Sequence, residues 1–242
     1  NLMGLDGYYS TGNKNSAGQI IETLIDASPF QNTGIRGPKI DYYNIGYVGW
    51  YGLNSMVEYK NDTFTAVLQA GGSNQTYQRE DLFDQPSLPL SEKVAVGGGY
   101  LKGGANINLD SRNNVFFNAG IISRQPNFDA IFPNYANIEN DDIQNEEIVS
   151  VEAGYGYLGA DVRVNVNVYS TTWGNRFVSR SLTNAQGVDG SAQFRDIDVR
   201  HNGIEIEGDY RPTNALKLSG MLSVGDWKYT KDFEAELFDD QQ

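Results

Sequence analysis

The residues best suited to chemistry are carboxylates that come in pairs. Asp141 and Asp142 are neighbours, and Asp196 and Asp198 are separated by one residue. Their oxygens are hard ligands of the kind that Ca²⁺ prefers, so these four residues are candidates for a calcium site. No spacing here matches an EF-hand loop, and solvated charge on a loop is the alternative interpretation. We therefore expect no resident cofactor, with Ca²⁺ as the one ion left open.

Enzyme chemistry has little support in this composition. The chain has a single histidine, His201, and no cysteine. A histidine-built zinc site, a thiolate site and a histidine-based catalytic triad are therefore disfavoured. Glu205, Glu207 and Asp209 alternate along one stretch, but nothing marks two of them as the matched pair that a glycosidase needs. The sequence indicates that the chain is not an enzyme.

Charge and hydropathy narrow the class of protein further. The 242 residues carry a net charge of -13, from 31 acidic and 18 basic residues, which argues against nucleic acid as a partner. No run of about 18 apolar residues is present, so the sequence contains no candidate transmembrane helix. The mean hydropathy of -0.48 is still compatible with a membrane barrel, because only every second residue of such a strand faces lipid.

Alternation with a period of two is the dominant pattern, and it predicts β-strands. In residues 161–168 every second residue is valine, and the residues between them are Asp, Arg and Asn. A strand places the two sets on opposite faces, whereas a helix would mix them. The same alternation recurs in residues 43–59, 63–69, 101–109, 115–121, 149–157, 203–210 and 216–224.

The connections between these strands alternate in length. Short links at residues 61–62, 110–114, 158–160 and 212–214 alternate with long ones at 80–93, 126–145 and 174–199. An antiparallel up-and-down transmembrane β-barrel, with tight turns on one side and long external loops on the other, has this pattern. We expect an all-β fold in which residues 42–229 form about eight strands. Residues 1–41 would be one external loop, and residues 230–242 the start of another.

One stretch of the sequence resembles a motif of a known family. Arg124, Pro126, Phe128 and Phe132 form an R-x-P-x-F-x-x-x-F pattern that resembles a stretch in the barrels of TonB-dependent receptors. There the pattern lies where a strand leaves the membrane, and residues 145–147 resemble the following re-entry, although the usual Pro before Glu is missing. Further stretches are similar to Bacteroidetes-type members, namely residues 49–52, 57–60, 101–106, 210–212 and 225–228.

The resemblance implies a receptor in the bacterial outer membrane that imports a scarce nutrient. Members are barrels of about 22 strands, and each is filled by an N-terminal plug domain. Their cargo is an iron chelate such as a siderophore, cobalamin, a glycan or a peptide. The inner-membrane protein TonB supplies energy through a segment near the receptor's N-terminus, and a surface lipoprotein is a possible partner. The plug domain and that segment have no counterpart in these residues, so we expect an internal portion of a larger barrel.

Ligand capture is expected on the external loops, where exposed aromatic and arginine side chains suit recognition. Packing of the loops against each other is the alternative role for the same side chains. Arg176 and Arg180 could also bind an anionic ligand or a phosphate of lipopolysaccharide. The candidates are Phe128, Phe132, Tyr135, Trp173, Arg176, Phe177 and Arg180.

Two other interpretations of the strand pattern remain open. The chain could be a self-contained small eight-stranded outer-membrane barrel with a structural or adhesive role. It could also be a secreted soluble β-rich binding protein, whose apolar strand faces would have to pack against each other as in a sandwich.

Overall fold

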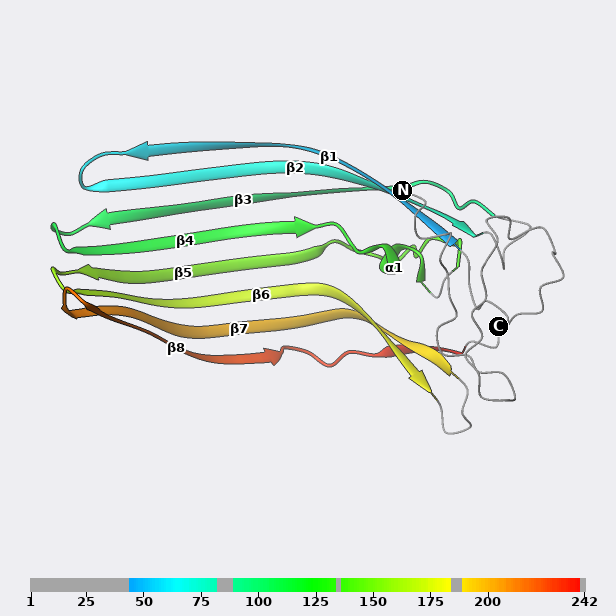
Figure 1. The fold of residues 1–242 in the computed structure, drawn as a ribbon. Helices are drawn as coiled ribbons and strands as arrows, with labels where there is room; N and C mark the ends of the chain where they lie inside the picture. The colour runs from blue at the N-terminus through cyan, green and yellow to red at the C-terminus, as the bar shows by residue number, and fades with distance from the viewer. Residues whose placement is uncertain (1–43, 82–88, 134–135, 184–188, 240–242) are drawn as a thin grey trace.

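Eight long antiparallel strands lie side by side in the computed structural model (Figure 1). The structure describes residues 44–81, 89–133, 136–183 and 189–239. The strands are β1 (Asn44–Lys60), β2 (Phe64–Asp81), β3 (Val94–Asn108), β4 (Asn113–Arg124), β5 (Glu146–Leu158), β6 (Val162–Thr183), β7 (Asp189–Thr213) and β8 (Leu216–Tyr229). A short helix, α1 (Phe128–Ile131), lies between β4 and β5, and a ninth strand, β9 (Ala235–Asp239), pairs with β7.

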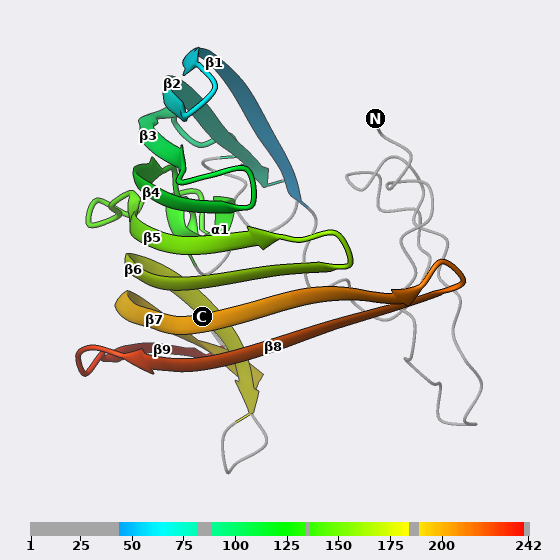
Figure 2. The ribbon, with the colours of Figure 1, turned by 90° about the vertical axis from the view of Figure 1, so that its left-hand side faces the viewer.

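Each strand pairs with the next one in the chain, so the order in the sheet runs from β1 to β8 without a crossover. The sheet curves from β1 to β8, as Figure 2 shows. In the part of the chain that the structure describes, β1 and β8 do not pair with each other, and the sheet keeps two edges. The predicted all-β, up-and-down architecture is confirmed as a portion of a barrel that is not closed here.

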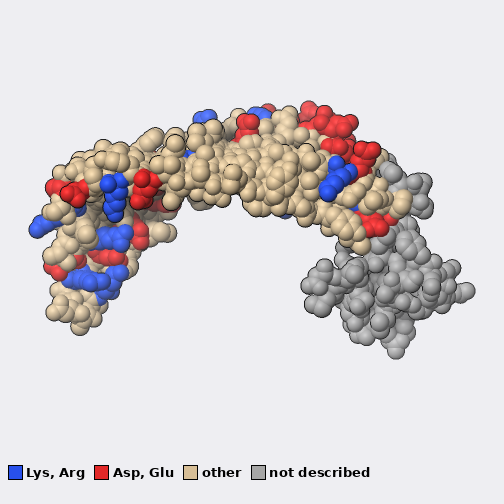
Figure 3. Space-filling view, turned by 90° about the horizontal axis from the view of Figure 1, so that it is seen from above, with Lys and Arg blue, Asp and Glu red and all other residues tan. Residues whose placement is uncertain are grey.

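Alternation along the strands gives the sheet one apolar and one polar face. Val168, Ile204 and Val224 are register neighbours across β6, β7 and β8, and their side chains are 49%, 39% and 57% exposed. In Figure 3 charged side chains gather toward the two ends of the visible face, with a largely uncharged stretch between them. An apolar face that nothing in the described chain covers is suited to contact lipid.

The turns between strands are tight at one end of the sheet, as the sequence predicts. At the β3–β4 turn, Oδ1 of Asp110 accepts the backbone N–H groups of Arg112 and Asn113 at 2.7 and 2.9 Å. The bond from Arg112 is the main reason why the pKa of the Asp110 carboxyl is held below its usual value. Asn61 has the same role between β1 and β2, where its Oδ1 accepts the N–H groups of Thr63 and Phe64. Side chains of this kind close turns of only a few residues.

The predicted long link at residues 174–199 is largely wrong. There β6 and β7 continue as a paired ribbon, to Thr183 on one strand and from Asp189 on the other. The register shifts twice between Trp173 and Val178, and Asn175 and Asp196 have φ values of 56° and 52°. Bulges of this kind break the two-residue period, which is why alternation gives no signal of the ribbon. Asn and Asp adopt the left-handed backbone more readily than other non-glycine residues.

Two other predicted loops have different outcomes. Residues 1–41, predicted to be an external loop, lie outside the described residues. Within residues 230–242, the short strand β9 pairs with residues 190–194 of β7 and so extends the external ribbon. The described residues contain no helix with the length and hydropathy needed to cross a membrane.

The assignment of faces predicts unequal effects of charge on β6. Val164→Arg should weaken folding into lipid vesicles by about 2–4 kcal/mol, because it places a cation on the lipid-facing side. Asn165→Arg should cost little, because Asn165 is the register partner of Glu207 on the inward face. The measurement is a folding titration of the receptor in vesicles. Equal losses from the two substitutions would contradict the assignment.

Candidate ligand-binding mouth

The connection between β4 and β5 folds over the inward face of the sheet instead of projecting away from it. The hydroxyl of Tyr77, on β2, donates a hydrogen bond of 2.6 Å to the carbonyl of Pro126. The ring of Phe128 lies 6.5 Å from that of Tyr77 and 5.3 Å from that of Phe132. With Val94 and Ile131 these residues form a buried apolar cluster, which fixes α1 over the sheet.

Asparagines hold this connection at both ends of α1. Oδ1 of Asn127 caps the helix by accepting the backbone N–H of Ala130 at 2.8 Å. Asn140 then donates its side-chain amide to the carbonyl of Ala130 and its backbone N–H to that of Ile131. A helix of four residues has few hydrogen bonds of its own, so these side chains supply the partners that its ends lack.

Two glycines make room for the connection. A Cβ at Gly46, on β1, would lie 3.1 Å from the ring of Phe128. A Cβ at Gly98, on β3, would lie 2.6 Å from Cδ of Gln125. The Gln125 amide crosses β3 at Gly98 and donates a 2.7 Å hydrogen bond to Oγ of Ser73 on β2. The glycines therefore allow β4 and its connection to contact strands farther along the sheet.

A buried charged group anchors the far part of the same connection. Arg79 is 2% exposed, and its Nη1 lies 3.1 Å from Oδ2 of Asp81 and 2.7 Å from Oδ1 of Asn137. The Arg79 backbone bonds to Ser91, whose N–H donates to the Arg79 carbonyl at 2.8 Å. Asn137 also donates to the carbonyl of Pro89 at 3.1 Å. Arg79 thus joins the end of β2 to the β4–β5 connection through its guanidinium and to the segment before β3 through its backbone.

A second group contains the accessible aromatic and cationic side chains. Nη1 of Arg124 and Nε1 of Trp173 both donate to Oε2 of Glu146, at 3.1 and 3.0 Å. The Arg176 guanidinium carbon lies 4.5 Å from the centre of the Trp173 ring, within range of a cation–π interaction. Within the described residues no carboxylate lies within ion-pair distance of Arg176. The Arg176 side chain is partly exposed.

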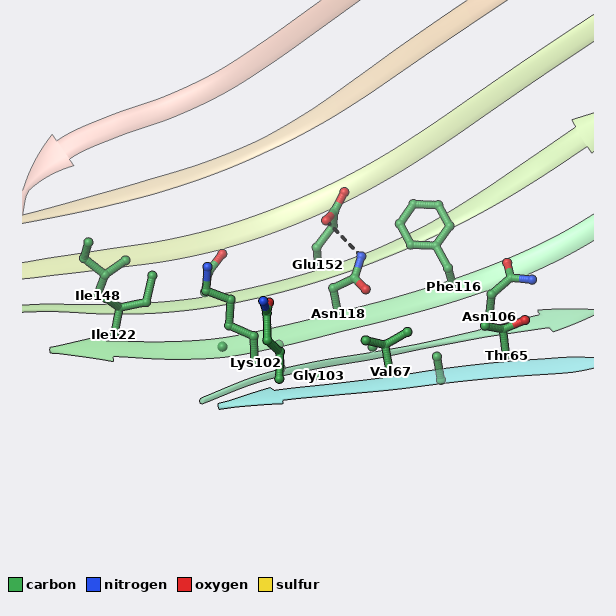
Figure 4. A pocket seen from close by; sticks show the side chains of 16 residues that line it. Thr65, Val67, Lys102, Gly103, Asn106, Phe116, Asn118, Ile122, Ile148 and Glu152 are labelled. Atoms are coloured by element: carbon green, nitrogen blue, oxygen red, sulfur yellow. Dashed lines mark hydrogen bonds between the residues drawn. The ribbon is translucent and has the colours of Figure 1, made fainter. Parts of the chain in front are cut away.

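Below the mouth, the inward faces of β2 to β5 border an open hollow of about 550 Å³ (Figure 4). Lys102 and Glu152 contribute opposite charges to its lining, and Phe116 and Ile122 contribute apolar surface. Glu152 accepts hydrogen bonds from the amides of Asn118 and Asn167, at 3.3 and 2.7 Å. The inward face therefore combines fixed polar groups with apolar patches.

The predicted calcium ligands come only partly together. Asp141, Asp142 and Asp196 line a shallow hollow of about 370 Å³, but Arg195 lines it too and lies 3.9 Å from Asp142. Asp198 forms an ion pair of 3.0 Å with Lys231 instead. Within the described residues no group of three or more acidic, histidine or cysteine side chains is arranged to hold a metal ion. A Ca²⁺ site remains an untested prediction.

The predicted ligand-binding residues occupy two kinds of position. Phe128 is half-buried and Phe132 is buried in the β4–β5 connection, and Phe177 is buried on β6. Trp173 and Arg176 are partly exposed, and Arg180 is exposed on the ribbon. Tyr135 lies outside the described residues. The three phenylalanines pack inside the protein, whereas the side chains of Trp173, Arg176 and Arg180 can be reached from solvent. Ligand binding remains a prediction for all of them.

Sequence reasoning did not identify Tyr77, Arg79, Asp81 or Asn137. Arg79 and Asp81 have a spacing of two on a strand, which places both on one face and could have marked an inward ion pair. The position of Asn137 carries no comparable signal, because it lies 58 residues away from Arg79 in the chain.

The anchor predicts a local loss of stability. Arg79→Met removes the cation beside Asp81, and breaking a buried pair typically costs about 3–5 kcal/mol. Backbone amides of α1 and Asn140 should then exchange with deuterium at least about a hundredfold faster, since 1.4 kcal/mol corresponds to a factor of ten. Arg180→Met, on the exposed ribbon, is the matched control. Unchanged exchange rates in the Arg79 variant would show that this anchor does not hold the connection.

Comparisons with known proteins agree with this geometry. The sequence model of the family described as "TonB dependent receptor-like, beta-barrel" matches residues 102–241, more than half of the chain. The solved structure of the copper transporter OprC is similar over 80% of this chain and 33% of its own, with a TM-score of 0.61 and 15% identity. That likeness shows the fold alone, and this chain spans a third of that protein's length.

The siderophore receptor PirA from Pseudomonas aeruginosa is similar over 76% of this chain and 50% of its own, at 14% identity. Its TM-score of 0.42 is too low to support an argument. No curated protein matches the sequence.

The matched residues include most of the strands and the whole mouth connection. The R-x-P-x-F-x-x-x-F residues have defined contacts: Arg124 pairs with Glu146, the Pro126 carbonyl accepts from Tyr77, and Phe128 packs on Phe132. The family consists of receptors and transporters, not of enzymes. The chain belongs to the TonB-dependent receptor-like β-barrel family and is part of a barrel in the bacterial outer membrane.

Proposed function

We propose that the protein containing this barrel portion binds a scarce nutrient at its external mouth and imports it. Energy would come from the inner membrane through TonB, which would contact the N-terminal part of the receptor. The family match and the inward-folded mouth support this function. The observation that carries the proposal is the accessible pair formed by Trp173 and Arg176, which lies at the start of the ribbon.

The chemistry of the mouth favours an organic ligand with anionic groups. Arg176 lies against an indole and has no carboxylate partner among the described residues, and Arg180 is exposed on the same strand. Soft metal ions prefer cysteine, methionine and histidine ligands. The chain has no cysteine, three methionines and one histidine, so a bare copper ion, the cargo of OprC, is a poor fit. An iron chelate such as a siderophore, cobalamin, an acidic glycan or a peptide fits better.

The two alternative functions require contacts that the structure does not have. A self-contained eight-stranded barrel needs β1 to pair with β8, and the described strands run from β1 to β8 without that pairing. A soluble binding protein needs its apolar face to be covered, yet Leu53 and Leu222 are 83% and 59% exposed. Neither alternative is favoured.

Uptake measurements in the bacterium that encodes the receptor would test the proposal. We expect deletion of its gene to slow growth when one nutrient class is limiting: an iron chelate, cobalamin, a glycan or a peptide. Uptake of that labelled nutrient should fall in the deletion strain, and it should fall to the same level when TonB is inactivated instead. No growth defect under any of the limitations, or uptake that persists without TonB, would contradict the proposed function.

The role of the mouth can be tested in the same assay. Replacement of Trp173 by Ala together with Arg176→Gln should raise the half-saturating nutrient concentration at least about tenfold, because a charge-assisted contact is lost. Arg112→Gln, in the β3–β4 turn at the other end of the sheet, removes an equal charge and should leave the half-saturating concentration unchanged. An unaltered half-saturating concentration in the double variant, at equal receptor levels, would exclude these two residues from the binding site.

A further inference from the structure

The outward face of β6, β7 and β8 changes from apolar to cationic over a few residues. Val168, Ile204 and Val224 form the last apolar row across the three strands. Two residues farther along each strand the row is Ser170, Asn202 and Asp226. After another two residues it is Thr172, Arg200 and Lys228.

The cationic row lies at the depth of the lipid headgroups. Tyr210, at the turn end of β7, is on the same face as Arg200, and the β7–β8 register between them is unbroken. These roughly ten residues, at about 3.3 Å each, span about 33 Å along the strand. With the strand tilt of about 40° that such barrels have, the height is about 25 Å, which equals the apolar band of an outer-membrane barrel. Tyr210 and Arg200 therefore bracket the apolar rows together with the row of Ser170, Asn202 and Asp226, and this polar row begins the headgroup region.

Arg200 is exposed on this face and has no ion pair with another described residue. Lys228 is its register partner, 58% exposed, and it pairs with Asp226 at 2.7 Å. Lys231 and Asp198 form the other ion pair here, at 3.0 Å. The carboxylates of Asp226 and Asp198 are thus paired with Lys228 and Lys231. Arg200, beside Lys228, has no carboxylate partner among the described residues.

We propose that Arg200 and Lys228, with the Thr172 hydroxyl, bind a phosphate of a phosphorylated lipid in the outer leaflet. A guanidinium binds two phosphate oxygens in a bidentate fork, and a lysine ammonium adds a point charge beside it. The apolar row of Val168, Ile204 and Val224, two rows below, accepts the acyl chains of the same molecule, so one lipid contacts both the cationic row and the apolar row. A soluble anion would gain nothing from that row. This inference depends on the placement in the outer membrane and not on the nutrient that is imported.

The test is binding of lipid A to the purified full-length receptor in detergent. Bisphosphorylated lipid A should bind at least about tenfold more weakly to the variant that combines Arg200→Gln and Lys228→Gln. Arg211→Gln, at the opposite end of β7, is the control and should bind as the wild type does. Dephosphorylated lipid A should bind the wild type about as weakly as the intact lipid binds the double variant.

Three outcomes would overturn the proposal. Equal binding of intact lipid A by the wild type and the double variant would exclude Arg200 and Lys228. Equal binding of intact and dephosphorylated lipid A by the wild type would exclude the phosphate. Competition by inorganic phosphate at millimolar concentration would identify a site for the free anion instead of a lipid. Nutrient uptake should be retained in the double variant, which separates this test from that of the proposed function.

Discussion

The constraint on which the whole structure depends is that peptide groups in lipid must find hydrogen-bond partners within the protein. The sheet meets it with a ladder that continues through eight strands, each paired with the next. The described register shifts lie in the middle of β6, between Trp173 and Val178, and at the turn end of β7, between Tyr210 and Thr213. Neither shift interrupts the paired stretch that contains Val164 and Val168. The ladder then dictates the alternation, because each pleat directs one side chain to lipid and the next inward.

The same requirement explains why the mouth is rich in asparagine. A connection that folds over the inward face buries its own peptide groups, and these need partners as well. Asn127, Asn137 and Asn140 supply them around α1, and Asn145 and Asn175 do so where β5 and β6 begin to diverge. Arg79 is a buried charged residue that contacts three segments, two through its guanidinium and one through its backbone. This rigid packing leaves Trp173 and Arg176 at its border as the accessible groups.

The sequence was sufficient to predict the strands within lipid, because there each side chain has one of only two environments. Residues 161–168, for example, are predicted from alternation and lie in β6. The ribbon beyond Trp173 could not be predicted, because bulges at Asn175 and near Asp196 interrupt the period. The anchor of Arg79 was also missed, since its partner Asn137 is close only in the folded chain. The motif from Arg124 to Phe132 indicated the family, but not that its rings pack on Tyr77.

The most direct test of the account is the lipid exposure of consecutive residues on β6. The chain has no cysteine, so single cysteines at positions 162–168 can carry a fluorophore without competing labels in this portion of the receptor. In vesicles of brominated lipid, we predict strong quenching at Val162, Val164, Val166 and Val168 and weak quenching at Arg163, Asn165 and Asn167. Uniform quenching, or quenching at none of these positions, would contradict the placement of this sheet in a membrane.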